Sequence, residues 1–125
     1  MRFVPTRVHG LIDYVWGLLL GTAPWTLGFA GDRIATAEAT VFGVGAILYS
    51  LVTNYEVGLL PVLPVPVHLV LDVAAGAILA ASPWIFGFAD RVFWPHLLFG
   101  LFSVVAGLVT ETKARSPDQI ASQRL

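Results

Sequence analysis

The sequence predicts an all-α protein, a four-helix transmembrane bundle made of two tandem, parallel helical-hairpin repeats. Three observations predict this fold class. First, 57% of the 125 residues are hydrophobic and only 12% are charged, whereas soluble domains are about half apolar and about a quarter charged. Second, long apolar stretches approach the roughly 20 residues that a bilayer span needs. Third, one segment of the chain occurs twice.

The repeated segment aligns without a gap, Pro5–Ala30 with Pro64–Ala89, and 11 of the 26 aligned positions are identical. The helices that follow repeat as well. Their matching pairs are Phe42-Gly43 with Phe99-Gly100, and Leu51-Val52-Thr53 with Leu108-Val109-Thr110. Each copy is therefore expected to be a complete helical hairpin.

The first hairpin is predicted over residues 1–55, with spans at about 6–30 and 35–55. Pro5 stiffens the entry to the first helix, where proline is tolerated. The polar stretch Gly31-Asp32-Arg33 is typical of a turn between the two spans.

Residues 56–66 are predicted to form an interfacial connector, because Pro61, Pro64 and Pro66 exclude a regular helix there. The second hairpin follows over residues 67–111, with spans at about 67–89 and 92–111. Residues 112–125 are predicted to be a polar cytoplasmic tail.

The distribution of Lys and Arg predicts the orientation in the membrane, since cytoplasmic loops are enriched in these residues. Two lie on the side of the inter-helix turns, Arg33 and Arg91. Five lie on the side of the termini: Arg2, Arg7, Lys113, Arg115 and Arg124. Both termini are therefore predicted to be cytoplasmic, and two spans per repeat give parallel repeats about an axis along the membrane normal.

The identical positions of each repeat share one side of a helix. At 100° per residue, an arc about 100° wide holds His9, Asp13, Gly17, Pro24 and Gly28, and its counterpart holds His68, Asp72, Gly76, Pro83 and Gly87. Polar and small residues on one stripe of a transmembrane helix face protein rather than lipid. The two first helices are therefore expected to face inward.

The other end of each repeated segment carries a Pro-Trp-x-x-Gly-Phe motif. Trp25 and Trp84 suit an aromatic belt at the outer membrane interface. The two prolines free a backbone carbonyl one turn earlier, which the hydroxyl of Thr22 or Ser82, or a water molecule, is expected to satisfy. Motif and packing roles are assigned to Gly17, Pro24, Trp25, Gly28, Phe29, Gly76, Ser82, Pro83, Trp84, Gly87 and Phe88.

Two His-x-x-x-Asp pairs, His9 with Asp13 and His68 with Asp72, are the candidate functional residues. The i, i+4 spacing puts both members of a pair on one helix face. An architectural role is favoured, in which each Asp satisfies backbone amides and each His orients it. The alternatives are proton or ion handling, a divalent metal site, and a haem between His9 and His68.

The Pro-Trp motif of the second copy resembles that of a known family. The stretch Ser82-Pro83-Trp84, followed by Gly87-Phe88, is similar to the signature of the SPW-repeat integral membrane proteins. The first copy has Ala23-Pro24-Trp25 instead. The resemblance implies a bacterial four-span protein of the inner (cytoplasmic) membrane, and it supplies no catalytic residues.

The expected function is that of a small, non-enzymatic structural or interaction module in the membrane. The alternative is a minimal conduit for protons, cations or small solutes that uses His9, Asp13, His68 and Asp72. The chain has no cysteine and no nucleophile arrangement or phosphate loop, so no catalytic residue, metal or cofactor is assigned. The expected partners are the lipid bilayer and a second copy or another membrane protein. A net charge of −1 gives no indication of nucleic acid.

Overall fold

The structure, a computed structural model, describes residues 1–114 and 118. Over residues 1–114 the chain forms four α-helices and no β-strand, which confirms the predicted all-α, four-helix fold class. The helices are α1 (Thr6–Thr26), α2 (Arg33–Leu51), α3 (Val65–Ile85) and α4 (Trp94–Val109). The predicted tail at 112–125 lies mainly at 115–117 and 119–125, outside the described residues.

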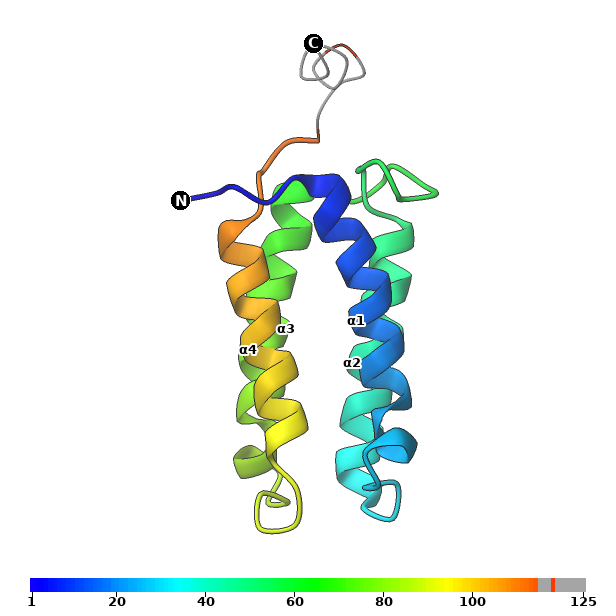
Figure 1. Ribbon diagram of the computed structural model, residues 1–125, viewed down its shortest axis with the longest axis vertical. Coiled ribbons are helices and arrows are strands. Elements are labelled where there is room, and N and C mark those ends of the chain that lie inside the picture. Colours follow the sequence, from blue (N-terminus) through cyan, green and yellow to red (C-terminus); the bar gives the residue numbers. More distant parts are fainter. Residues whose placement is uncertain (115–117, 119–125) are drawn as a thin grey trace.

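The helices form two hairpins that lie side by side. α1 packs mainly on α2, and α3 packs mainly on α4. The two inter-helix turns lie at one end of the bundle, whereas residue 1, the connector between α2 and α3, and the end of α4 lie at the other (Figure 1). The two hairpins therefore run in the same direction.

Matching glycines bring the two helices of each hairpin close together. A Cβ added to Gly43 would lie 2.7 Å from the carbonyl oxygen of Gly17, and one added to Gly76 would lie 2.7 Å from that of Gly100. Such distances leave no room for a side chain, because the atoms opposite belong to the backbone. The small residues on the predicted stripe therefore pack within the hairpins.

The first helix of each hairpin is shorter than predicted. α1 ends at Thr26 and α3 at Ile85 rather than near residues 30 and 89. Gly28 and Gly87 have φ angles of 81° and 75°, a left-handed conformation that glycine adopts readily and that ends helices. Both glycines thus lie in the turns, and nothing lies within 4 Å of a Cβ added to either. The prediction that they continue the inward stripe is wrong.

The other boundaries also differ from the predicted spans. α2 begins at Arg33, where Asp32 caps it by accepting a hydrogen bond from the Ala35 N–H (3.0 Å), and it ends at Leu51 rather than near 55. α3 begins at Val65, because a proline such as Pro66 is tolerated in a first helical turn. α4 has 16 residues rather than the predicted span at 92–111.

Short backbone pairings set where α2 and α4 end. Val4 forms an isolated β-bridge with Thr110, and Leu63 forms one with Thr53. In the first, the Glu111 N–H donates to Val4 O (2.8 Å), and in the second the Asn54 N–H donates to Leu63 O (2.8 Å). In both bridges the residue before a first helix binds the residue after the second helix of the other hairpin. The two threonines consequently lie beside the first turns of α1 and α3.

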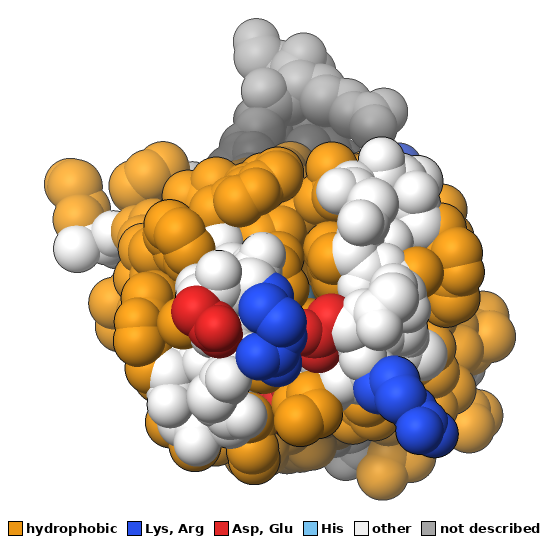
Figure 2. Space-filling view, turned by 90° about the horizontal axis from the view of Figure 1, so that it is seen from below, with side chains coloured by type: hydrophobic (Ala, Val, Ile, Leu, Met, Phe, Trp, Pro, Cys, Tyr) orange, Lys and Arg blue, Asp and Glu red, His pale blue; other side chains and the backbone are white. Residues whose placement is uncertain are grey.

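The pattern of burial is the reverse of that in a soluble protein. Large apolar side chains are exposed along all four helices, among them Leu18 (61%), Val41 (67%), Val70 (66%) and Leu98 (56%). In contrast, the polar side chains of His9, His68, His96, Asp13 and Asp72 are buried. Viewed along the bundle, hydrophobic side chains form most of the periphery (Figure 2). This distribution is typical of helices that contact lipid.

Two helices, α2 and α3, are long and apolar enough to cross a membrane, judged by length and composition. α4 is a shorter apolar helix. Together with the exposed apolar side chains, these helices indicate a small membrane protein.

The proline-containing ends of α1 and α3 are not held in the same way. Pro83 leaves the Leu79 carbonyl without its helical N–H partner, and Ser82 Oγ donates to that oxygen (2.7 Å) as predicted. Thr22 Oγ1 donates to Leu18 O (2.8 Å) instead of the carbonyl that Pro24 frees, which is that of Leu20. Of the two predicted partners for this carbonyl, the Thr22 hydroxyl is therefore excluded, because its side chain lies on the exposed face of α1.

Candidate functional site

The two predicted His-Asp pairs come together in one buried cluster at the end of the bundle that holds the connector. His9 Nε2 lies 2.8 Å from Asp72 Oδ2 and 3.1 Å from Asp13 Oδ1. His68 Nε2 lies 3.0 Å from Asp13 Oδ2 and 3.2 Å from Asp72 Oδ2. One nitrogen or oxygen atom from each side chain lies within 4.8 Å of all the others. We call these four residues the His/Asp cluster.

The cluster forms because α1 and α3 face one another across the two hairpins. The i, i+4 spacing puts His9 and Asp13 on one face of α1, and His68 and Asp72 on one face of α3. The two imidazole rings meet edge to face, with centroids 5.4 Å apart and an interplanar angle of 77°. Each histidine therefore contacts the aspartate of its own helix and that of the other hairpin.

Two threonines fix the tautomer of the histidines. Thr110 Oγ1 donates to Ala106 O (2.6 Å), and Thr53 Oγ1 donates to Tyr49 O (2.6 Å). Each hydroxyl oxygen is then available only as an acceptor for the imidazole beside it. His9 Nδ1 accordingly donates to Thr110 Oγ1 (2.7 Å), and His68 Nδ1 donates to Thr53 Oγ1 (2.7 Å). Both Nε2 atoms consequently point to the centre of the cluster.

Two tyrosines hold the carboxylates from the outside. Tyr55 donates its hydroxyl to Asp13 Oδ2 (3.0 Å), and the Tyr49 hydroxyl donates to Asp72 Oδ1. These bonds orient the carboxylates, and both oxygens of Asp13 and Oδ2 of Asp72 also lie close to the histidines. They also provide the donors that a buried carboxylate needs.

The cluster is almost sealed from solvent. The exposed fractions are 1% for His9, 9% for Asp13, 0% for His68 and 2% for Asp72. Since each Nδ1 carries a proton, a neutral ring would direct the lone pair of Nε2 at carboxylate oxygens. A cation, either an additional proton or a metal ion, is therefore needed between the rings and the carboxylates.

The part of the chain that contains the cluster also matches a known protein family. The family model for the SPW repeat domain matches residues 7–110. The chain belongs to the SPW repeat domain family. No curated protein and no solved structure has a significant match to it. The matched range contains all four cluster residues, both threonines and both tyrosines, so the cluster belongs to the SPW repeat domain itself.

The Pro-Trp ends of the SPW repeat domain lie away from the cluster, at the end of the inter-helix turns. Trp25 and Trp84 are 65% and 56% exposed. Phe29 and Phe88 are buried there, and both pack against His96. His96 Nε2 donates to Ala35 O (2.9 Å), so this third histidine is separate from the cluster.

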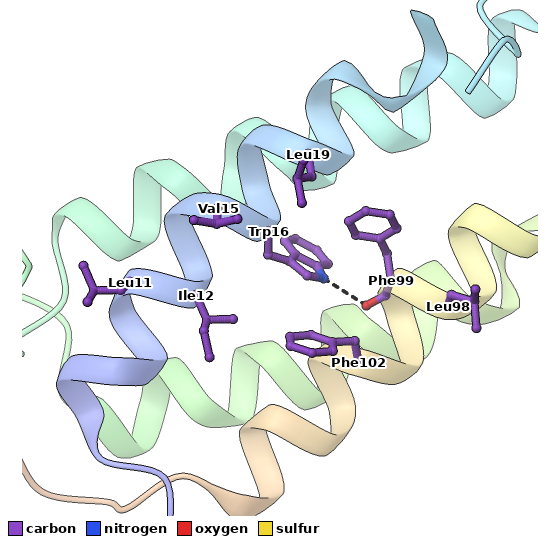
Figure 3. Close-up of a pocket in the computed structure, with 8 residues that line it drawn as sticks. All are labelled: Leu11, Ile12, Val15, Trp16, Leu19, Leu98, Phe99 and Phe102. Carbon is purple, nitrogen blue, oxygen red and sulfur yellow. Dashed lines mark hydrogen bonds between the residues drawn. The ribbon is translucent and has the colours of Figure 1, made fainter. Parts of the chain in front are cut away.

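A second feature of the SPW repeat domain is an apolar cleft between α1 and α4, about 510 Å³ in volume (Figure 3). Trp16 lies across the inner wall of this cleft and donates its Nε1–H to Phe99 O (3.1 Å). Ile12, Trp16 and Phe102 also line the cavity of about 10 Å³ beside the cluster. That cavity is about large enough for one water molecule or ion.

The threonines beside the cluster have a signal in the sequence, whereas the tyrosines do not. Thr53 and Thr110 occupy matching positions just after the second helices, as the repeated Leu-Val-Thr shows. Their pairing with His68 and His9 crosses the two hairpins, so it does not follow from a pattern within one helix. Tyr49 and Tyr55 have no tyrosine counterparts in the second repeat, and their contacts gave no sequence signal.

Proposed function

We propose that this member of the SPW repeat domain family is a non-enzymatic membrane module whose two hairpins are fastened together by the His/Asp cluster. The observation that carries this proposal is the reciprocal bonding of the histidines. His9 of the first hairpin contacts Thr110 and Asp72 of the second. His68 of the second contacts Thr53 and Asp13 of the first. Both nitrogens of each ring therefore reach the opposite hairpin.

We further propose that the chain crosses a bacterial inner membrane four times with both termini in the cytoplasm. Arg2 donates a hydrogen bond to Thr110 O (2.8 Å), so the segment before α1 and the end of α4 lie at the same end of the bundle (Figure 1). That end carries more Lys and Arg than the turns, which have Arg33 and Arg91, as is usual for cytoplasmic segments. The similar geometry of the two hairpins supports an origin by internal duplication.

The expected partners are the lipid bilayer and a second copy of the chain or another membrane protein. The exposed apolar side chains on all four helices support contact with lipid. They also offer surfaces for packing against another helix bundle, since association in lipid depends on close packing rather than on hydrophobicity alone.

A conduit for protons or cations is the second candidate, because ionisable side chains from two helices meet inside the bundle. A structural role, in which the cluster links the two hairpins, is favoured over a conduit by the residues between the cluster and the inter-helix turns. Between the cluster and the inter-helix turns the core contains Leu20 and Leu79, and Phe88 is buried at the turns, each 0% exposed. Among the described residues, these apolar side chains lie across the path from the cluster to the turns.

The fastening role predicts a loss of stability when either carboxylate is neutralised. Asp13→Asn and Asp72→Asn should each lower the free energy of unfolding by on the order of 3 kcal/mol, since one partner of a buried charge pair is removed. The measurement is thermal unfolding of the full chain in detergent. Asp90→Asn is the matched control, because the Asp90 side chain is 78% exposed. Unchanged melting of both cluster variants contradicts the proposal.

Reconstitution into liposomes separates the two candidates. The fastening role predicts that wild-type proteoliposomes pass protons and monovalent cations no faster than empty liposomes. A wild-type flux that Asp72→Asn abolishes, with the variant still folded, would instead support the conduit.

A further inference from the structure

We propose that the His/Asp cluster binds one divalent first-row transition-metal ion. The ligands are Nε2 of His9, Nε2 of His68, and one oxygen each from Asp13 and Asp72. This inference deepens the proposed function, on which it rests, because the ion would link the two hairpins through ligands from both.

The spacing of the donor atoms fits a four-coordinate ion. Metal–ligand bonds of about 2.0–2.1 Å in a tetrahedral site put neighbouring ligand atoms about 3.3–3.4 Å apart. The imidazole–carboxylate distances in the cluster are 2.8 and 3.2 Å to Asp72 Oδ2, 3.1 Å to Asp13 Oδ1 and 3.0 Å to Asp13 Oδ2. One donor atom from each of the four side chains lies within 4.8 Å of the others. Each imidazole–carboxylate contact would need to lengthen by only a few tenths of an ångström to reach the spacing of coordinating atoms.

The hydrogen bonds around the cluster orient every ligand. Histidines that bind a metal through one nitrogen usually donate the other N–H to an oxygen acceptor, which fixes the ring and its tautomer. Thr110 and Thr53 provide that acceptor for His9 and His68. Tyr55 and Tyr49 hold the carboxylates in the same manner. Both Nε2 atoms are thereby available as ligands.

An independent observation points to a missing ligand. His68 Nε2 is buried and makes no hydrogen bond of good geometry among the described residues, although carboxylate oxygens lie 3.0 and 3.2 Å away. Buried polar atoms without a partner are rare in native proteins. A cation among His68, Asp13 and Asp72 would satisfy this nitrogen.

The donor set indicates the class of ion and its role. Two imidazoles and two carboxylates suit zinc and neighbouring first-row ions such as manganese and iron better than the thiolate-binding soft ions. Four protein ligands leave no open position, which is the arrangement of structural rather than catalytic sites. The ion would therefore replace the protons of the cluster as the cation that joins the hairpins.

The test measures metal on the full chain purified in detergent. The protein is stripped with a chelator, incubated with Zn²⁺, freed of unbound ion and analysed for metal by mass spectrometry. We expect one ion per chain and a higher melting temperature, since the ion binds only the folded state. Substitution with Co²⁺ should give the intense visible bands of a tetrahedral site.

His96→Gln is the matched control, because His96 is a buried histidine of the same bundle outside the cluster. It should keep one ion per chain, whereas His9→Gln and His68→Gln should lose it. Thr53→Val leaves all four ligands in place and should weaken binding about 10–100-fold, as removal of a bond to a ligating histidine does. Retention of the ion by both cluster variants, or its loss in His96→Gln, overturns the proposal.

Different results would disprove the metal site and the role of the cluster in linking the hairpins. If folded wild-type protein takes up neither Zn²⁺, Co²⁺ nor Mn²⁺ and its melting is unchanged by them, the metal proposal is wrong. Under the same conditions Asp13→Asn and Asp72→Asn would still lower the melting temperature if the cluster fastens the hairpins through protons alone.

Discussion

Ser82 and Thr22 lie near the prolines of the two repeats and make different hydrogen bonds. Ser82 Oγ binds Leu79 O, the carbonyl that Pro83 deprives of its helical partner. Ser82→Ala should lower the free energy of unfolding by about 1–3 kcal/mol, because it leaves a buried carbonyl unsatisfied. Thr22→Ala should change it little, because Thr22 lies on the exposed face. Denaturant unfolding in detergent measures both, and equal losses contradict this assignment.

For the cluster residues, the sequence predicted only the helix face on which each side chain lies. The i, i+4 spacing and the duplication were enough to expect both His-Asp pairs on inward faces. The convergence of His9 with Asp72 and of His68 with Asp13 required the placement of α1 against α3. The threonine bonds required two backbone bridges, Val4 with Thr110 and Leu63 with Thr53, and the periodicity of a single helix does not predict such contacts.

The helices of each hairpin approach most closely at glycines, and Gly43 shows the consequence. A Cβ at this position would lie 2.6 Å from the Gly21 backbone nitrogen and 2.7 Å from Gly17 O. Gly43→Ala should therefore destabilise the protein by about 1–3 kcal/mol, because backbone atoms of α1 have to move. Near-UV circular dichroism during thermal unfolding, together with the melting temperature, reports the change.

Gly45→Ala is the control for that prediction. It lies on the same helix, and nothing lies within 4 Å of a Cβ added there. Alanine is the better helix former by roughly 1 kcal/mol, so this variant should be neutral or slightly more stable. Equal destabilisation by Gly43→Ala and Gly45→Ala would mean that close helix contact is not the reason for glycine at position 43.

Helix number and type followed from the sequence, but helix ends did not. Apolar residues continue past Thr26 and Ile85, so hydropathy alone extended the first span of each hairpin into the turn. The glycines at 28 and 87 ended the helices through their backbone conformation. The ends of α2 and α4 depended on pairing with residues 63 and 4, which no local signal describes.

At the scale of the whole molecule, the hairpins are joined at both ends by different chemistry. The buried cluster joins them at the connector end, and an exposed ion pair joins them at the turns, where Arg91 Nε donates to Asp32 Oδ2 (2.5 Å). Acidic and basic side chains meet at this end of the bundle (Figure 2). The second contact is accessible to solvent, so bulk pH reaches it directly.

The Asp32 carboxylate makes that contact sensitive to acid. The hydrogen bond from the Ala35 N–H, together with Arg91, holds the pKa of Asp32 below its ordinary value of 3.8. A carboxylate with a lowered pKa in the folded state stabilises the protein fully above the ordinary value, and that contribution is lost as pH falls through the lowered pKa. Wild-type protein should therefore be more stable than Asp32→Asn at neutral pH, and the difference should shrink below about pH 3.8.

Asparagine is the suitable substitution because it caps a helix about as well as aspartate, so the variant removes the charge and keeps the cap. Melting temperatures of both proteins are compared from neutral pH to about pH 3 at low ionic strength, where exposed pairs are least screened. The His/Asp cluster lies at the other end of the bundle, so its contribution to stability is common to both proteins and cancels in the difference. A difference that is independent of pH, or that grows as the pH falls, contradicts a stabilising contact of the ionised Asp32 with the second hairpin.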